Sequence, residues 1–350
     1  MRWYRLKREL VATKIEVGVL GATGPIGEHL LSRLDHHPWF QTTWVSASDG
    51  EVGRRMRDVP WRAYGQMPAG FAELKIERLR PGAAPRLVFS ALPAPEAGEA
   101  ERAFAAAGHF VVSATPNFRL DPLVPLLVAD INPQHLGLLE SQRSGKQWRG
   151  SLVTSPSFVA RRLATLMAAL REFEVERAIV ARADGPAVGG EKNLGEMEWG
   201  DPEIEAETKK VLGRLVTNGI EPHPVLISVQ GAAGRSDHEL VWLELGRKIG
   251  REQVKNALLE FRGLSKASHL PSAWEMAIAW EAESADSFLA DSDNRPGSEV
   301  QVAGFRDSTV LDFKFKVAGP GSDDTVAVGA LQNVELLIAW SLRAGWRIES

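Results

Sequence analysis

The chain has 350 residues, no cysteine and a formal net charge of −4 from 41 basic and 45 acidic side chains. This length allows two domains with large cores, and the near-balance of charge argues against a nucleic-acid-binding protein. The lack of cysteine excludes disulfides, thiolate metal sites and a cysteine nucleophile. The apolar runs are too short for a membrane span, and the basic N-terminus lacks the apolar segment of a signal peptide. We therefore expect a cytoplasmic α/β protein with no metal site.

A glycine-rich turn dominates the first part of the chain. Residues 15–20 are mostly apolar and β-branched, which predicts a buried strand. Gly21, Gly24 and Gly27 follow with the spacing G-x-x-G-x-x-G, and a helix is predicted to open at Pro25. Strand, glycines and helix in this order are typical of a dinucleotide-binding turn, in which the pyrophosphate lies against the helix N-terminus. A tight turn without a ligand is the alternative.

Strands and helices alternate up to about residue 115. The sequence predicts a helix rich in alanine and glutamate at 96–107. It predicts further buried strands at 42–47, 74–79, 86–93 and 110–113. This alternation predicts a parallel, doubly wound sheet of the Rossmann type with right-handed crossovers.

The pattern changes beyond residue 150. Helices are predicted at 158–173, 202–215 and 251–261, and strands at 175–183, 224–229, 239–245 and 309–317. The apolar segment 326–344 predicts a helix that packs back on the first domain. We therefore expect a Rossmann domain at 1–154, an α+β catalytic and dimerisation domain at 155–325, and the returning helix within 326–350.

Six segments together resemble the aspartate-β-semialdehyde dehydrogenase family of the archaeal and fungal type. They are G-A-T-G-P-I-G at 21–27, D-H-H-P-W-F at 35–40, L-V-F-S-A-L-P at 87–93, R-L-D-P-L-V-P-L-L-V-A-D-I-N-P at 119–133, E-I-E-A-E-T-K-K-V-L at 203–212 and Q-N-V-E-L-L-I-A at 332–339. The resemblance implies a homodimer or tetramer that reduces an aspartyl phosphate to the semialdehyde with NADPH.

By this resemblance the cofactor would contact residues of the first domain and the C-terminal helix. They are Gly21, Thr23, Gly24, Pro25, Ile26, Gly27, Ser48, Ser90, Leu92 and Asn333. The loop at 47–54 departs from the family, because Gly50 and Glu51 replace the arginine and serine that hold the 2′-phosphate of NADP. Glu51 adds negative charge there, so NADP is disfavoured. NAD, a smaller nucleotide or no cofactor remain open, and Asp49 or Glu51 could accept ribose hydroxyls.

The nucleophile position departs most strongly. The family attacks the acyl phosphate with a cysteine thiolate in an Asn-Pro-Asn-Cys turn. The matching residues here are Ser155, Pro156, Ser157 and Phe158. Phe158 carries no nucleophile, and serines replace both asparagines, which indicates natural divergence. Ser157 is better placed as a helix N-cap than as a substitute nucleophile.

The other catalytic positions are only partly kept. An ungapped alignment puts Asp237 at the position of the family's histidine base, whereas a shift of one residue puts His238 there. Glu203 stands where the family has a phosphate-binding lysine, and this charge reversal would repel an acyl phosphate. Arg119 matches the family's phosphate arginine. Pairing with an acidic neighbour across the domain junction is its alternative role.

Three hypotheses follow. The first is a pseudoenzyme with a structural or regulatory role, for example as partner of an active enzyme subunit. The second is an NAD(P)-dependent oxidoreductase with thiol-free chemistry on a small carbonyl or imine, in which His238 or Asp237 supplies the acid. The third is the family activity with an unforeseen nucleophile. In each case we expect a homodimer that contacts neither nucleic acid nor membrane.

Overall fold

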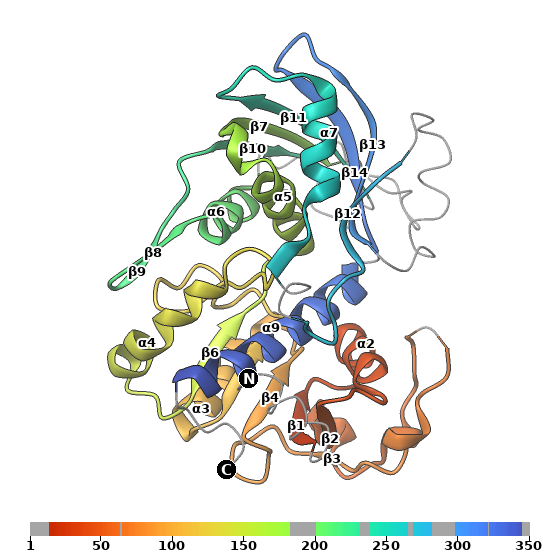
Figure 1. The fold of residues 1–350 in the computed structure, drawn as a ribbon. Coiled ribbons are helices and arrows are strands. Elements are labelled where there is room, and N and C mark those ends of the chain that lie inside the picture. The colour runs from red at the N-terminus through yellow and green to blue at the C-terminus, as the bar shows by residue number, and fades with distance from the viewer. Residues whose placement is uncertain are drawn as a thin grey trace, which may run out of the picture.

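The structure, a computed structural model, describes residues 14–63, 65–182, 201–231, 238–264, 269–281, 298–320 and 322–344. Two units lie one above the other in Figure 1, and the long helix α9 (Ser322–Ala344) crosses the lower unit at their junction. Each unit is built on its own six-stranded sheet.

The sheet of the lower unit is parallel throughout. Its spatial order is β3-β2-β1-β4-β5-β6, with β1 (Ile15–Leu20), β2 (Phe40–Ser46), β3 (Ile76–Glu77), β4 (Leu87–Ser90), β5 (Phe110–Ser113) and β6 (Ser151–Thr154). This order reverses between β1 and β4, as in a doubly wound Rossmann sheet. The predicted fold class is therefore confirmed for this part of the chain.

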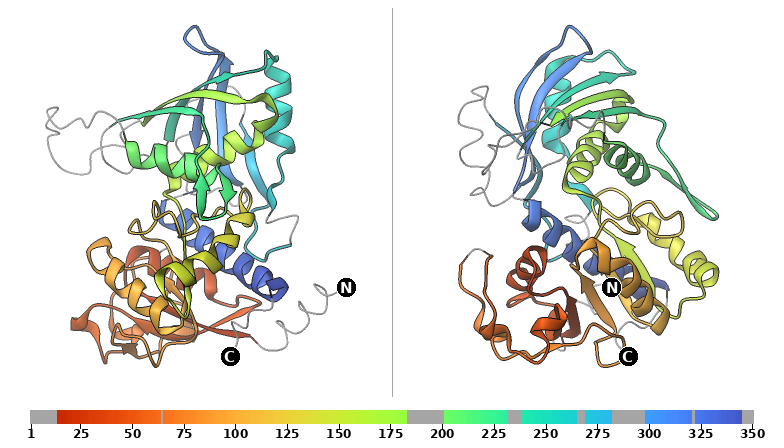
Figure 2. Two further views of the ribbon diagram at one scale, coloured as in Figure 1. Left: turned by 90° about the vertical axis from the view of Figure 1, so that its left-hand side faces the viewer. Right: turned by 180° about the vertical axis from the view of Figure 1, so that it is seen from behind.

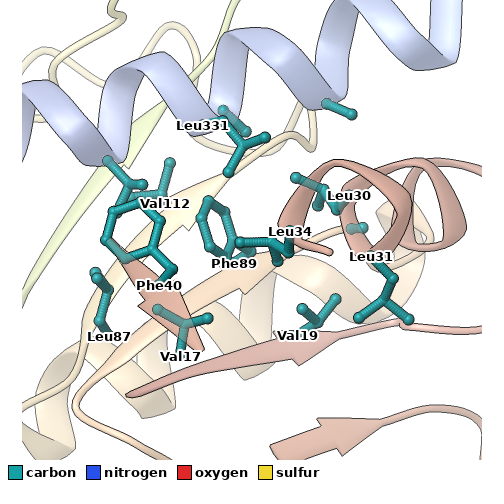
Figure 3. Close-up of a cluster of buried hydrophobic side chains, with 14 of the residues drawn as sticks. Val17, Val19, Leu30, Leu31, Leu34, Phe40, Leu87, Phe89, Val112 and Leu331 are labelled. Atoms are coloured by element: carbon teal, nitrogen blue, oxygen red, sulfur yellow. The ribbon is translucent and has the colours of Figure 1, made fainter. Parts of the chain in front are cut away.

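Helices cover both faces of this sheet. They are α2 (Pro25–Leu34), α3 (Ala94–Ala107), α4 (Leu138–Lys146) and α9. Figure 3 shows Leu331 of α9 facing Phe40, Phe89 and Leu34, all of which are buried. The last helix thus completes a core whose other members come mostly from the first 153 residues of the chain.

The sheet of the upper unit is mixed. Its order is β10-β7-β11-β14-β13-β12, with β7 (Val175–Arg182), β10 (Leu226–Gln230), β11 (His238–Leu245), β12 (Met276–Trp280), β13 (Ser298–Asp307) and β14 (Phe313–Ala318). The helices α5 (Phe158–Ala169), α6 (Pro202–Val211) and α7 (Arg251–Glu260) share one apolar core with it. The predicted α+β character is confirmed.

A short hairpin links the two units. Its strands β8 (Arg214–Val216) and β9 (Gly219–Glu221) follow α6 and reach toward α4, which Figures 1 and 2 show from three sides. The buried His135 of the lower unit lies 3.0 Å from the carbonyl oxygen of Gly213 at the base of this hairpin. Burial lowers the pKa of His135 to about 4.

Several predicted boundaries are wrong for local reasons. The helix predicted at 202–215 ends at Val211, because β8 begins at Arg214. The strand predicted at 309–317 begins only at Phe313, since the Ser308 hydroxyl binds the amides of Val310 and Leu311 in a turn. The strand predicted at 74–79 is only two residues long.

Candidate functional site

The candidate site lies at the carboxyl ends of the parallel strands, where open α/β sheets bind ligands. Gly21 leaves β1 with φ +77°, and a Cβ atom there would lie 2.6 Å from the carbonyl oxygen of Ala91. A Cβ on Gly27 would clash with the carbonyl oxygen of Gly21. Both positions therefore require glycine for steric reasons, without reference to a ligand.

The same turn offers hydrogen-bond donors. Gly24 is the N-cap of α2 and Pro25 is its first residue. The amides of Ile26 and Gly27 belong to the first turn, so they lie outside the intrahelical ladder. Thr23, Gly24 and Ile26 are half-buried and Pro25 is exposed, so the predicted pyrophosphate position is accessible.

A carboxylate lies beside this turn. Glu51 ends a short 3₁₀ helix after β2, and its Oε2 accepts hydrogen bonds from Thr23 Oγ1 at 2.9 Å and from Ser48 Oγ at 3.0 Å. The nearby Arg54 donates to the carbonyl oxygen of Asp58. The ribose of a dinucleotide would lie beside this carboxylate. The carboxylate can accept hydrogen bonds from the ribose hydroxyls and would repel a 2′-phosphate.

The carboxyl ends of β4 and β5 are closed by internal hydrogen bonds. Ser113 Oγ and Thr115 Oγ1 donate to Glu101 Oε1 of α3 at 2.7 and 3.0 Å. Glu101 is fully buried, and this burial raises the pKa of its carboxyl group. Ser90 and Leu92, two of the predicted cofactor residues, are also buried here.

The sequence resemblance matches the residues at the N-terminus of α5, Ser155 to Phe158, to the family's nucleophile turn. Ser157 caps the helix by accepting from the amide of Ala160 at 3.4 Å, as its residue type predicts. The ring of Phe158 packs on the core of the upper unit, and the guanidinium of Arg162 lies 5.1 Å from its centroid. Among the described residues, this helix start therefore holds no thiol, and its Ser157 hydroxyl serves as the cap.

Arg119 is fully engaged by protein groups. Its Nη1 lies 3.1 Å from Glu207 Oε1, Nε donates to Ser155 O at 3.0 Å, and Nη2 donates to Ala114 O at 3.3 Å. The other oxygen of Glu207 accepts from the amide of Ser157 at 2.7 Å. A carboxylate of the chain itself therefore takes both donors that an anionic substrate would use. These contacts match the alternative role, pairing across the junction.

Of the two candidate bases, the structure describes only His238, and it does not bring this side chain to Phe158. Asp237 lies outside the described residues. His238 begins β11, and the next residue, Glu239, points to α5, where its carboxylate lies 3.2 Å from Nη1 of Arg162. Because side chains alternate across a strand, His238 points to the opposite face of the sheet. Glu203 is exposed in the first turn of α6.

Sequence reasoning missed two buried ion pairs behind the site. Arg161 pairs with Glu299 and donates to Gln332 of α9 at 2.5 Å, and Arg162 pairs with Glu239. A Cβ on Gly329 would lie 2.6 Å from Nη1 of Arg161, so this glycine makes room for the guanidinium. Two adjacent arginines inside the apolar run F-V-A-R-R-L-A-T-L-M were the available signal.

Asn333 ties α9 to the site. Its Nδ2 donates to Leu127 O and to Ser155 Oγ, both at 3.0 Å. Its Oδ1 has no hydrogen-bond partner among the described residues, and the side chain is fully buried. The amide therefore acts first as a link between the lower unit and the start of α5.

Two further features limit other kinds of site. Within the described ranges, no group of three or more histidine, aspartate or glutamate side chains could hold a metal ion. Among the helices that the structure describes, none is long and apolar enough to cross a membrane.

A groove of about 660 Å³ between the end of α5 and the start of β10 is lined by both signs of charge, including Arg171 and Glu174, and lies away from the glycine turn.

Comparisons with known proteins agree with this architecture. Residues 16–139 match the family model of the semialdehyde dehydrogenase NAD-binding domain. The chain is 29% identical over 343 residues to the aspartate-semialdehyde dehydrogenase of Archaeoglobus fulgidus, covering 93% of this chain and 98% of that protein. It is 31% identical over 294 residues to that of Trichophyton rubrum, covering 76% and 80%.

A solved structure shows the same fold. The aspartate semialdehyde dehydrogenase of Candida albicans with NADP superposes with a TM-score of 0.81 at 24% identity, covering 93% of this chain and 99% of that one.

Proposed function

The chain belongs to the aspartate-semialdehyde dehydrogenase family, and from that premise we propose that it is a nucleotide-binding member without the family's reductase activity, whose role is structural or regulatory. The single observation that carries this proposal is Phe158 at the start of α5, in a chain with no cysteine. Acyl transfer to the enzyme needs an activated nucleophile, which a phenyl ring cannot supply.

The charges around α5 support the same conclusion. An acyl phosphate needs cationic or amide donors that are available to its oxygens. Here Glu207 accepts from the Ser157 amide and pairs with Arg119, and Glu207 is 2% exposed. A phosphate would have to displace this carboxylate or lie beside it, and both are unfavourable.

We infer that a bound dinucleotide would be NAD rather than NADP. When bound, the cofactor would supply a hydride acceptor or donor through its nicotinamide ring. The glycine turn fits the pyrophosphate of either cofactor, because Ile26 and Gly27 present first-turn amides. Glu51 fits a ribose with two free hydroxyls but not a 2′-phosphate, because its carboxylate already lies beside Thr23 and Ser48.

A homodimer through the upper sheet is part of the proposal. The face of this sheet opposite α5 carries Ile179, which is 36% exposed, together with half-buried Leu240 and Trp242. Ile179 and Trp242 are direct neighbours in the β7–β11 ladder. Adjacent apolar side chains of this size on one open face are typical of a subunit contact, and a second copy with two-fold symmetry would bury them.

Thiol-free hydride transfer, the alternative, lacks a supporting observation. It needs a proton donor beside the reacting carbonyl. Among the described residues His238 points away from α5, and Glu207, the carboxylate nearest to the helix start, is held by Arg119 and the Ser157 amide. We therefore favour the inactive member.

The test is the phosphate-dependent oxidation of aspartate semialdehyde by purified protein, with NAD and with NADP. We expect no turnover above the blank. The variant Phe158→Cys should also be inactive, because Glu207 still occupies the anion donors and Glu203 is unchanged. Ordinary turnover by the wild-type protein would overturn the proposal, and rescue by this single change would show that the rest of the site is intact.

A further inference from the structure

We propose that the crevice accepts a ribonucleoside diphosphate, such as the ADP moiety, and that it has no binding position for the nicotinamide half of a dinucleotide. This inference rests on the nucleotide binding proposed above. It concerns the two halves of the doubly wound sheet, each of which holds one mononucleotide in a dinucleotide-binding domain.

The half built on β1, β2 and β3 is open. Thr23 and Ile26 are half-buried, and Pro25 and Ser48 are exposed. First-turn amides of α2 face the position of a pyrophosphate, and Glu51 offers carboxylate oxygens to ribose hydroxyls. Every group that this half needs for a nucleoside diphosphate is therefore within reach of a ligand.

The half built on β4, β5 and β6 is closed. The side chains at the carboxyl ends of these strands are at most 3% exposed, namely Ser90, Ser113, Thr115, Thr154 and Ser155. Four of their hydroxyls are engaged inside the protein: Ser113 and Thr115 bind Glu101, Thr154 binds Pro125 O, and Ser155 accepts from Asn333. The Ser90 hydroxyl is fully buried and has no hydrogen-bond partner among the described residues. A nicotinamide riboside would have to break these bonds or reach the buried, unpartnered oxygens of Ser90 and Asn333.

Backbone hydrogen bonds also fix the strand ends of this half. The strand-like segment at Leu126 bridges to Thr154 alongside β6, and the amide of Leu127 donates to Thr154 O at 2.8 Å. The amide of Ala114 donates to Ser90 O at 2.9 Å. Backbone bonds thus hold the strand ends in place beside the buried side chains.

Asn333 is the amide here that could recognise a carboxamide, since its Oδ1 has no partner among the described residues. It is fully buried, however, and both of its Nδ2 bonds hold the wall of the crevice together. A ligand reaches this oxygen only if α9 moves away from Leu127 and Ser155. The open and closed halves therefore predict that only the ADP part of NAD contributes to binding.

Isothermal titration calorimetry of the full chain with four ligands tests this inference. We expect NAD, ADP-ribose and ADP to bind with dissociation constants within about threefold of one another, and nicotinamide mononucleotide not to bind. A tenfold or greater advantage of NAD over ADP-ribose, or measurable binding of nicotinamide mononucleotide, would overturn the inference while leaving the proposed nucleotide binding intact.

Variants locate the bound ligand. Ile26→Asp places a negative charge at the pyrophosphate position and should weaken ADP-ribose at least thirtyfold. Val310→Asp adds the same charge at a position that is 69% exposed in the upper unit, and it should bind as wild type. Circular dichroism would confirm that both variants fold. If Ile26→Asp binds ADP-ribose normally, the ligand is elsewhere and the inference fails.

If none of the four ligands binds, both this inference and the proposed nucleotide binding fail. The proposed loss of reductase activity would still be judged separately, because its assay measures turnover and does not depend on the affinity of ADP-ribose.

Discussion

Replacing Glu51 tests the electrostatic argument for NAD most directly. The variant Glu51→Gln keeps an acceptor oxygen near Thr23 and Ser48 but removes the negative charge. We expect it to gain affinity for NADP while its affinity for NAD falls by less than tenfold, because an amide oxygen still accepts from a ribose hydroxyl. The variant Glu51→Arg should prefer NADP outright.

The magnitude follows from the position of the carboxylate. Glu51 lies beside the turn that would hold the ribose, and we take its charge and that of a 2′-phosphate as about 5 Å apart. At that separation each unit of like charge costs about 1–3 kcal/mol, for an effective dielectric constant between that of water and about 20. The ratio of NADP to NAD affinity should therefore rise about 5- to 150-fold in Glu51→Gln.

Calorimetric or fluorescence titration of both cofactors at low and at high salt measures this ratio. The effect should shrink as salt screens the charges. Asp49→Asn is the matched control, because it removes the same charge from the exposed start of the same 3₁₀ helix. A wild-type protein that prefers NADP, or a ratio that Asp49→Asn changes as much as Glu51→Gln does, would refute the reasoning.

Three further predictions concern assembly and stability. Light scattering should give twice the chain mass of 38.3 kDa, and Trp242→Glu should halve that mass or unfold the protein; a wild-type monomer removes the claim. His135 has its pKa lowered to about 4, so the unfolded chain alone takes up this proton as the pH falls below 6.5. Stability should therefore fall by about 3 kcal/mol between pH 6.5 and 4, and urea titrations should show a smaller loss in His135→Gln; equal losses would contradict this. Gly27→Ala should cost about 1–3 kcal/mol by urea titration, because its Cβ clashes with Gly21 O; unchanged stability would mean that the turn relaxes freely.

The first sheet was the more predictable part of the fold. Its strands are short apolar runs beside turn residues, and β5 was predicted with its observed bounds, Phe110–Ser113. The strand β6 was missed, because its sequence S-L-V-T has only two apolar residues, whereas β5 has the apolar run F-V-V. The helix α4 was missed as well, since its sequence L-L-E-S-Q-R-S-G-K is mostly polar and contains a glycine.

In the second sheet, the missed strands depend on distant partners. Glu299 is fully buried in β13, although the sequence pattern would place a glutamate on the solvent-facing side of a strand. Its burial depends on the ion pair with Arg161 of α5. The strand β12 is only M-A-I-A-W, without a period that separates strand from helix. An ion pair between residues 138 positions apart leaves no recognisable pattern in the sequence of β13 itself.

In the candidate site too, residues with local partners were predictable from the sequence and residues with distant partners were not. The loop alignment already placed Glu51 near the ribose, because that prediction needed only local neighbours. The sequence also offered an acidic partner for Arg119, but it could not name Glu207, which is 88 residues away in the chain. The direction of His238 depends on the register of β11 against β7 and β14, and only the folded sheet sets that register.

The position of α9 has a consequence for synthesis on the ribosome. Domains generally fold from the N-terminus as the chain emerges, yet the core around Phe40 and Phe89 is completed by Leu331, which is made after every strand of both sheets. Until then one apolar face of the first sheet has no cover from α9. A nascent chain arrested before residue 322 should therefore be a chaperone client and sensitive to protease. The first sheet would become protected only when the last helix docks beside α2.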